Sequence, residues 1–570
     1  MKKFTFGIPD EFAPSRFSRT LNYTETETKI TKDFFKAKKT KAGFVIEFPL
    51  ENGTQIFGFG LQLKQFNHTG SRIKLCVNSD PVSKNGDSHA PVPFFATNKG
   101  YGMYFDTSRY AEFYCGKVKK AERARSEILP EGGGDTEAEL YKMRKESGVV
   151  MSVLIPASDG IDIYVFEGEK IVDIVKQYNM LAGGGCDVPE WGLGMQYRCF
   201  NRWNSQKIIE TAEHLKEKNI PCSMIGVEPG WHSHKYPCTF EWALNNFPDP
   251  DAFLQKMKEL GLHVNLWEHA YTHPESCLFE PLYPYSADYL LWGGLIPDFA
   301  KEEARKIFTD HHKKLVKQGV DGFKLDECDS GDYVGSWGFP LLTEFPSGLD
   351  GEQYHSLFGV LYAQVLLDAL EEKPTYSLIR QMGALAAPYP FVLYSDLYDP
   401  NDFVRGVVNS GFSGLLWTPE FRQCWNKKEC IRRLQAVAFS AMCLVNAWNY
   451  DGIPWEMLDC EDEVREIFEE RYRLIPRLKK AFEKYNKEGV PPIRALVMDY
   501  TFDVETYQID NEWLLGDDLL VAPITTWESD ERKVYLPRES EWVDYYTNEP
   551  VESGWSDVIN QKIPVFRKIK

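Results

Sequence analysis

The sequence predicts an α/β protein built around a (β/α)8 barrel, with a β-sandwich before the barrel and a small β-sandwich after it. Short runs rich in aromatic and β-branched residues, separated by turn residues, fill the chain up to about residue 185. From about residue 190, strand-like apolar runs alternate with segments of helical spacing, and after about residue 490 the β pattern returns. We therefore expect domains at 1–185, 186–489 and 490–570.

The N-terminal sandwich is predicted from runs such as "GFVIEFPL", "QIFGFG" and "IDIYVFEG", each followed or preceded by Gly, Asn, Asp or Pro. Two glycine-rich stretches, "PEGGGDTEAE" and "LAGGGCDVPEWG", interrupt this pattern. We place the first domain boundary at the second stretch.

The barrel is predicted from helical spacing in three segments, 205–219, 251–261 and 302–319, each of which leads into a short apolar run. Eight apolar runs occur in order: "WGLGMQYR", "CSMIGVE", "HVNLWEH", "VDGFKLD", "TYSLIR", "FVLYSD", "GFSGLLW" and "LVNAW". Because successive βα units of this length form parallel strands, a closed barrel is expected. The runs "IRALVMDY", "EWLLGDDLLVAP" and "EWVDYY" then predict the C-terminal sandwich.

Carboxylates stand at the ends of two predicted barrel strands. Asp326 ends the fourth run, within "GVDGFKLDECDSGDY", and Asp396 ends the sixth. In a (β/α)8 barrel, side chains at the carboxyl ends of the strands share one active-site mouth. Two carboxylates on one rim are the working groups of a glycosidase, either retaining or inverting according to their separation.

The chain resembles glycoside hydrolase family 31 over nearly its whole length. "DGFKLDECD" is similar to the family's nucleophile strand, and "RQMGALAAPYPFVLYSD" to its acid/base segment. The order of elements in "WLLGDDLLVAPI", "RKVYLP" and "EWVDYY" resembles its C-terminal sandwich. The resemblance implies exo-acting, retaining cleavage of an α-linked sugar without metal or organic cofactor, with Asp326 as nucleophile and Asp396 as acid/base.

The predicted sugar-binding end of the site departs from the family pattern. The family's Asp-rich second-strand motif is replaced by "IGVEPGWHSH", which places Glu228 and Trp231 there. This difference favours an α-galactoside-type hexose, with an α-glucoside or α-xyloside as alternatives. A transglycosylase of the same architecture and a carbohydrate-binding protein without catalysis remain open.

Six residues are candidates for substrate binding. Arg380 either binds the sugar or orients the nucleophile, and Glu228 either binds hydroxyls or braces a loop through Arg198. Strand alternation places Glu327 on the face opposite Asp326. Tryptophans at strand ends either stack on sugar or pack in the rim. The full substrate-binding set is Glu228, Trp231, Trp267, Lys324, Arg380 and Trp417.

Composition narrows the classes of partner. The net charge of −19 disfavours nucleic acid and anionic membrane surfaces, so a neutral oligosaccharide or small α-glycoside is expected. The 12 cysteines show no C-x-x-C pair, and the histidines show no metal-binding spacing. With no apolar signal-like run after "MKKFTFGIPDEF", a cytoplasmic location is expected. The pattern does not specify an oligomeric state.

Overall fold

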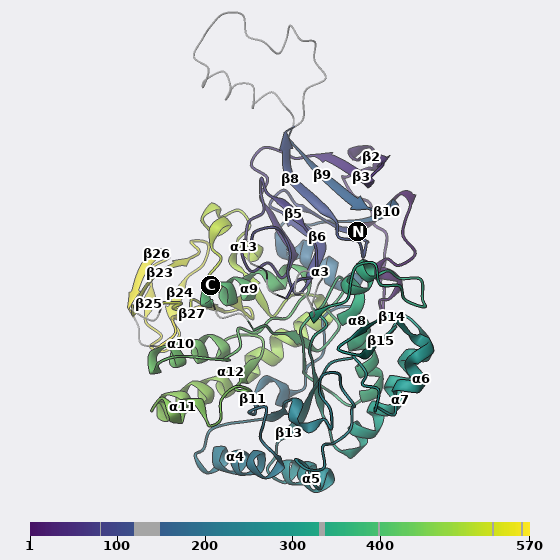
Figure 1. Cartoon of the computed structure of the whole chain (residues 1–570). Helices are drawn as coiled ribbons and strands as arrows, with labels where there is room; N and C mark the ends of the chain where they lie inside the picture. The colour runs from purple at the N-terminus through teal and green to yellow at the C-terminus, as the bar shows by residue number, and fades with distance from the viewer. Residues whose placement is uncertain are drawn as a thin grey trace, which may run out of the picture.

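The computed structural model describes residues 1–79, 81, 83–118, 149–329, 337–396, 399–526, 529–559 and 562–569. The N-terminal strands lie at one end of the barrel, and the C-terminal strands lie beside it (Figure 1). The expected loop "PEGGGDTEAE" lies outside the described residues. None of the helices in the described part of the chain combines the length and apolar composition that a membrane crossing requires.

The N-terminal region forms two five-stranded antiparallel sheets packed face to face. Alternating apolar side chains of the two inner faces bury a core rich in phenylalanine, including Phe48, Phe59, Phe95 and Phe113. One sheet has the order β1 (Lys2–Ile8), β10 (Asp159–Glu167), β7 (Tyr101–Phe105), β6 (Pro91–Thr97) and β4 (Ile56–Gly60). The other has the order β2 (Lys36–Thr40), β3 (Gly43–Pro49), β9 (Val149–Pro156), β8 (Glu112–Val118) and β5 (Arg72–Lys74).

The barrel contains a parallel sheet of seven strands. Its order is β18 (Phe391–Leu393), β17 (Ser377–Ile379), β16 (Gly322–Leu325), β13 (His263–Glu268), β12 (Met224–Val227), β11 (Met195–Arg198) and β19 (Cys443–Asn446). Every neighbouring pair is parallel, and the first strand of the domain pairs with the last. The predicted α/β fold class is therefore confirmed.

The predicted seventh strand, "GFSGLLW", is wrong as a regular strand. Gly411–Ser413 is instead a 3-10 turn, η7, and Gly414 adopts a left-handed backbone. A single parallel bridge links Trp417, at the end of this segment, to Leu393, and a second links Phe421, four residues later, to Val445. Pro419 lies between the two bridges and has no N–H to donate to a ladder, which explains why pairing stops there.

Helices surround the sheet on the outside of the barrel (Figure 1). The three predicted segments form α4 (Ser205–Glu217), α5 (Pro250–Glu259) and α7 (Glu302–Gln318). Asn204 and Asp249 cap α4 and α5 by accepting a main-chain N–H of the first turn. The later helices are α8 (Gly351–Leu370), α9 (Pro400–Ser410), α10 (Lys427–Ala438) and α12 (Glu461–Glu488).

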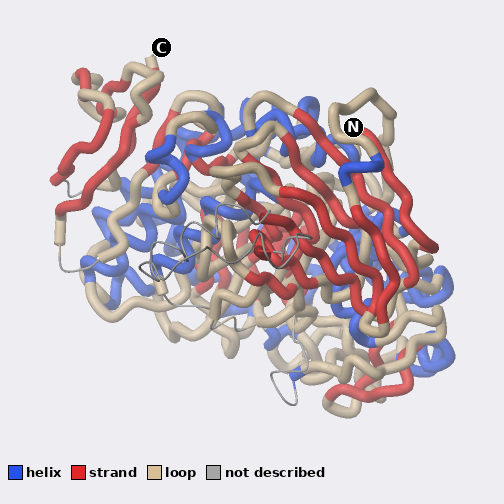
Figure 2. The backbone as a smooth tube through the Cα atoms, turned by 90° about the horizontal axis from the view of Figure 1, so that it is seen from above, coloured by secondary structure: helices blue, strands red, loops and turns tan. Residues whose placement is uncertain are grey.

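The C-terminal region is again antiparallel β-structure. Seen from above, the strands next to the C-terminus lie on the other side of the molecule from the N-terminus (Figure 2). The larger sheet has the order β20 (Ile493–Ala495), β21 (Trp513–Leu515), β22 (Leu519–Val521), β27 (Val565–Lys568), β24 (Trp542–Asp544) and β25 (Pro550–Val551). The smaller pairs β23 (Glu531–Leu536) with β26 (Gly554–Ile559).

Candidate active site

A cavity of about 400 Å³ lies at the carboxyl ends of the barrel strands. The predicted residues that line it are Glu228, Trp267, Lys324, Asp326, Arg380 and Asp396. They belong to β13 and β16 or follow β12, β16, β17 and β18 within three residues, so the barrel topology explains why distant segments meet here. The other lining residues are Ser79, Asn201, Pro229, Lys235, Tyr236, Glu327, Trp337, Arg422 and Trp448.

Asp326 is held in one orientation by donors on both carboxylate oxygens. The Trp267 indole Nε1 donates to Oδ2 at 2.6 Å, and the Glu327 main-chain N–H donates to Oδ1 at 3.0 Å. Arg380 Nη1 lies 3.8 Å from the same Oδ1. Trp267 therefore serves to position this carboxylate, in addition to lining the cavity.

Arg380 connects the two predicted catalytic carboxylates. Its Nη1 lies 3.8 Å from Asp326 Oδ1 and donates to Asp396 Oδ2 at 2.6 Å. Because both distances share one atom, these two carboxylate oxygens are at most about 6.4 Å apart. Both side chains line one cavity, so they can act on the same bond.

Asp396 lies between two guanidinium groups. In addition to Arg380, Arg422 Nη1 lies 3.1 Å from Asp396 Oδ1. Burial opposes ionisation of Asp396, but the charges of Arg380 and Arg422 outweigh burial and lower its pKa to about 2. In the arrangement seen here Asp396 is thus ionised at neutral pH.

A residue of the N-terminal region reaches this site. His89, in the loop between β5 and β6, lies with Nδ1 2.8 Å from Asp329 Oδ2, and Arg380 Nε donates to the same oxygen at 3.0 Å. His89 and Asp329 are fully buried. Burial opposes ionisation of Asp329, but Arg380 and His89 lower its pKa. Since a carboxylate can only accept, His89 Nδ1 is the donor.

The inner wall of the cavity is a buried polar chain. Glu228 forms an ion pair with Arg198 and accepts from Lys324 Nζ at 3.2 Å through each oxygen. Lys324 also donates to Asn446 at 3.4 Å, and Asn446 donates to Glu420 at 2.7 Å. Burial and the nearby Asp396 charge raise the pKa of Glu420 to about 8. Glu228 is paired with Arg198 and also lines the cavity, so its binding of substrate hydroxyls stays a prediction.

Two predicted sugar-stacking residues, Trp231 and Trp417, lie outside the cavity lining. Both side chains are fully buried. The Trp231 indole donates to the Trp267 carbonyl at 2.6 Å, and the Trp417 indole donates to the Phe403 carbonyl at 3.0 Å. Their faces are therefore used for packing, which corrects the expectation that they stack on sugar.

Glu327 lines the same cavity as Asp326, whereas strand alternation placed it on the opposite face. The alternation rule fails because Glu327 has a backbone φ of 55°, in the left-handed region. Tyr236 donates its hydroxyl to Glu327 Oε1 at 3.3 Å. Burial and then the Asp326 charge raise the pKa of Glu327 well above its ordinary value.

Sequence reasoning missed the residues that come from loops. Arg422 lies beyond the seventh predicted run, Trp448 is the last residue of the eighth run but lies beyond the end of β19, and Tyr236 follows η4 (Pro229–Trp231). Their proximity to predicted strand ends was an available signal. His89 offered none, because the chain between it and Asp329 covers 240 positions.

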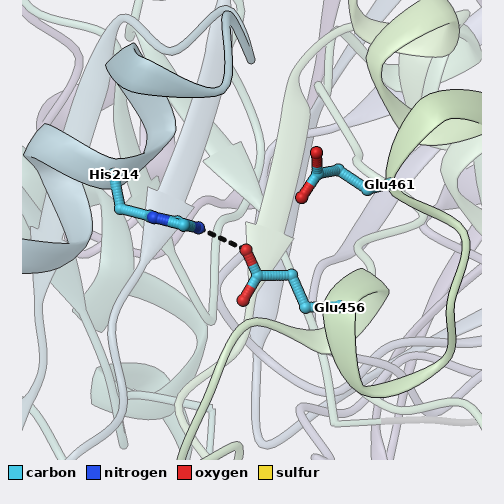
Figure 3. A group of neighbouring side chains, drawn as sticks. All are labelled: His214, Glu456 and Glu461. Atoms are coloured by element: carbon cyan, nitrogen blue, oxygen red, sulfur yellow. Dashed lines mark hydrogen bonds and ion pairs between the residues drawn. The ribbon is translucent and has the colours of Figure 1, made fainter.

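One group of possible metal ligands occurs within the described residues: His214, Glu456 and Glu461, on α4, α11 (Pro454–Met457) and α12. Figure 3 shows His214 directed at Glu456, with which it forms an ion pair. Glu461 is already engaged by Lys218 at 3.4 Å and Arg465 at 2.9 Å. None of the three lines the cavity, and surface ion pairs account for the cluster.

The barrel and the C-terminal region each match a known family of protein domains. Residues 186–481 match the glycosyl hydrolases family 31 TIM-barrel domain, and residues 489–569 match the glycosyl hydrolase family 31 C-terminal domain. Among curated relatives, an α-xylosidase of Emericella nidulans is 23% identical over 535 residues, covering 88% of this chain and 64% of its own length. An α-glucosidase 2 of Bacillus thermoamyloliquefaciens is 24% identical, covering 91% of this chain and 67% of its own length.

Solved structures show the same fold. A Flavobacterium johnsoniae GH31 dextranase, complexed with glucose, matches with a TM-score of 0.79 at 20% identity, covering 95% of this chain and 68% of that one. A GH31 α-xylosidase from a soil metagenome, complexed with xylose, matches with a TM-score of 0.76 at 19% identity, covering 94% of this chain and 81% of that one. The chain spans about two thirds of the length of most of these proteins.

Proposed function

Because the chain belongs to glycosyl hydrolase family 31, we propose that it is a retaining α-glycosidase that removes a terminal sugar. The single observation that carries this proposal is the placement of Asp326 and Asp396 around Arg380 in one cavity. Glu228 and Lys324 at the buried inner wall favour recognition of a chain end.

The proposed reaction is a double displacement. Asp326 attacks the anomeric carbon while a proton on Asp396 passes to the leaving oxygen, and the glycosidic bond breaks. Water, deprotonated by Asp396, then attacks the same carbon, releases the sugar with its original configuration and frees Asp326. The two carboxylate oxygens are at most about 6.4 Å apart, a limit that includes the roughly 5–5.5 Å separation of retaining pairs.

Asp396 must gain a proton before it can act as the acid. With a pKa of about 2 beside Arg380 and Arg422, it is ionised in the structure described here. We infer that bound substrate excludes water and separates Asp396 from at least one arginine, which raises its pKa toward the working range.

The identity of the sugar is a proposal of its own. The α-galactoside-type preference was predicted from the segment that contains Glu228, and the Glu228 side chain is held by Arg198 and Lys324. The relatives and structures named above carry the names α-xylosidase, α-glucosidase and dextranase, which gives that preference no support. α-Xylosides and α-glucosides are therefore tested on an equal footing with α-galactosides.

The test is hydrolysis of 4-nitrophenyl α-glucoside, α-galactoside, α-xyloside and N-acetyl-α-galactosaminide. We expect release of nitrophenol from at least one of them, with the α-anomer of the sugar appearing first by NMR. Asp326→Asn should reduce kcat by about 10⁴-fold or more, because the nucleophile is lost. Near-normal turnover by that variant, or first appearance of the β-anomer, would contradict the mechanism.

The same experiment separates the remaining alternatives. Transfer of the sugar to an added acceptor in preference to water would indicate a transglycosylase. Binding of sugars without turnover of any substrate would indicate a carbohydrate-binding protein.

A further inference from the structure

We propose that Glu327 is a substrate-binding residue whose side chain donates a hydrogen bond to a hydroxyl of the sugar on the leaving-group side of the scissile bond. The inference rests on the proposed glycosidase function and extends it to the part of the substrate that departs. The argument uses the backbone, the contacts and the position of this residue in the cavity.

The backbone at Glu327 is bent in a way that serves the site. A φ of 55° is unfavourable for a residue with a Cβ and persists where surrounding contacts maintain it. Here the Glu327 N–H donates to Asp326 Oδ1 at 3.0 Å, and the Glu327 carbonyl accepts from the Tyr271 hydroxyl at 2.8 Å. The same bend that directs the N–H to Asp326 brings the Glu327 side chain into the cavity.

The Glu327 carboxyl is arranged as a hydrogen-bond donor. Its Oε1 accepts from the Tyr236 hydroxyl at 3.3 Å, so the second oxygen is the one that can carry the proton. The hydrogen bond from Tyr236 is the one found for this carboxyl within the described part of the chain, and it uses Oε1. Burial and the charge of Asp326 raise the pKa of this carboxyl, which supports the protonated form. A neutral carboxyl beside Asp326 also avoids placing two negative charges together.

The aromatic rings around Tyr236 indicate that Glu327 lies on the leaving-group side of the cavity. The Tyr236 ring lies 5.5 Å from the Trp267 ring, which holds the nucleophile, and 6.2 Å from the Trp337 ring. Trp337 is 44% exposed, whereas Glu228 and Lys324 at the inner wall are buried. Glu327 therefore lies between the nucleophile and the mouth of the cavity, where the departing sugar passes.

The experiment compares two substrates that share one terminal sugar: a disaccharide, and the 4-nitrophenyl glycoside, whose leaving group has no sugar hydroxyls. For Glu327→Ala we expect kcat/KM on the disaccharide to fall about 30-fold, and on the nitrophenyl glycoside less than about threefold. Glu327→Gln keeps a donor and an acceptor without a charge, so it should restore the disaccharide activity to within about threefold of wild type.

Controls separate this proposal from the proposed function and from folding. Wild-type protein that cleaves neither substrate would refute the function before any variant is compared. Glu275→Ala, an exposed glutamate outside the cavity, is the matched control and should match wild type on both substrates. Equal losses on both substrates for Glu327→Ala, no loss on either, or failure of Glu327→Gln to restore activity would overturn the proposal.

Discussion

Replacement of His89 tests whether the N-terminal region holds the active-site arginine in place. His89 Nδ1 donates to Asp329 at 2.8 Å, and both side chains are fully buried. Loss of a buried hydrogen bond to a carboxylate costs about 1.5–3 kcal/mol, and an unfilled imidazole cavity adds about 1 kcal/mol. We therefore expect His89→Ala to lower the free energy of unfolding by about 3 kcal/mol.

His89→Ala should also lower activity, because His89 and Arg380 both contact Asp329. Asp329 fixes the Nε edge of the Arg380 guanidinium, and the Nη1 edge of the same group contacts Asp396. A less constrained Asp329 allows this guanidinium to move, and a misplacement of this kind costs about tenfold in kcat/KM. Activity is measured on the best nitrophenyl α-glycoside, and unfolding is followed with urea.

Two further variants make the prediction specific. The amide nitrogen of His89→Asn can take the place of Nδ1, whereas that of His89→Gln extends toward the position of Nε2. We expect His89→Asn to recover most of the tenfold loss and His89→Gln to recover little. Unchanged kcat/KM in folded His89→Ala, or equal recovery by both amides, would refute the reasoning.

Three other predictions follow from the structure. Asp396→Ala with added azide should regain turnover of an activated aryl glycoside and give an α-glycosyl azide, identified by NMR; a β-azide would mean different roles for the two carboxylates. Glu420 has a folded pKa of about 8, above its unfolded value of about 4.5, so its contribution to stability is complete below pH 4.5 and is lost as pH rises through 8. Glu420→Gln should therefore show a smaller fall in thermal midpoint between pH 5 and 9 than wild type; identical pH dependence would argue against a neutral Glu420. Arg471, fully buried, donates to four main-chain carbonyls at 2.6–3.2 Å, so Arg471→Met should destabilise the protein by about 3–5 kcal/mol in urea unfolding, and a change below 1 kcal/mol would contradict this accounting.

The positions of Asp326 and Asp396 could be predicted because they depend on topology. Parallel strands of one barrel end on one rim, so a polar residue that terminates an apolar run is placed before any side-chain detail is known. Trp267, Lys324 and Arg380 follow from the same rule, and all three line the cavity.

The positions of the other site residues depend on backbone angles and on contacts between distant segments, which a local sequence pattern does not specify. Glu327 was assigned to the wrong face because the period of two holds only for extended backbone, and a φ of 55° ends that condition at this residue. Trp231 follows Glu228 by three residues, but it is the last residue of a 3-10 turn and its ring is buried. His89 enters from another part of the fold, which no local pattern in the barrel segment encodes.

The irregular segment between β18 and β19 affects where the protein opens locally. Four main-chain hydrogen bonds, two to Leu393 and the others to Leu444 and Asn446, join residues 416–421 to the flanking strands. Because few main-chain hydrogen bonds hold this segment, local opening should start there. Its amide hydrogens should exchange faster than those at the strand positions of the barrel. Since Arg422 lies at the end of this segment and Trp267 belongs to β13, which has a paired strand on each side, such opening would separate Arg422 from Asp396 while Trp267 stays bonded to Asp326.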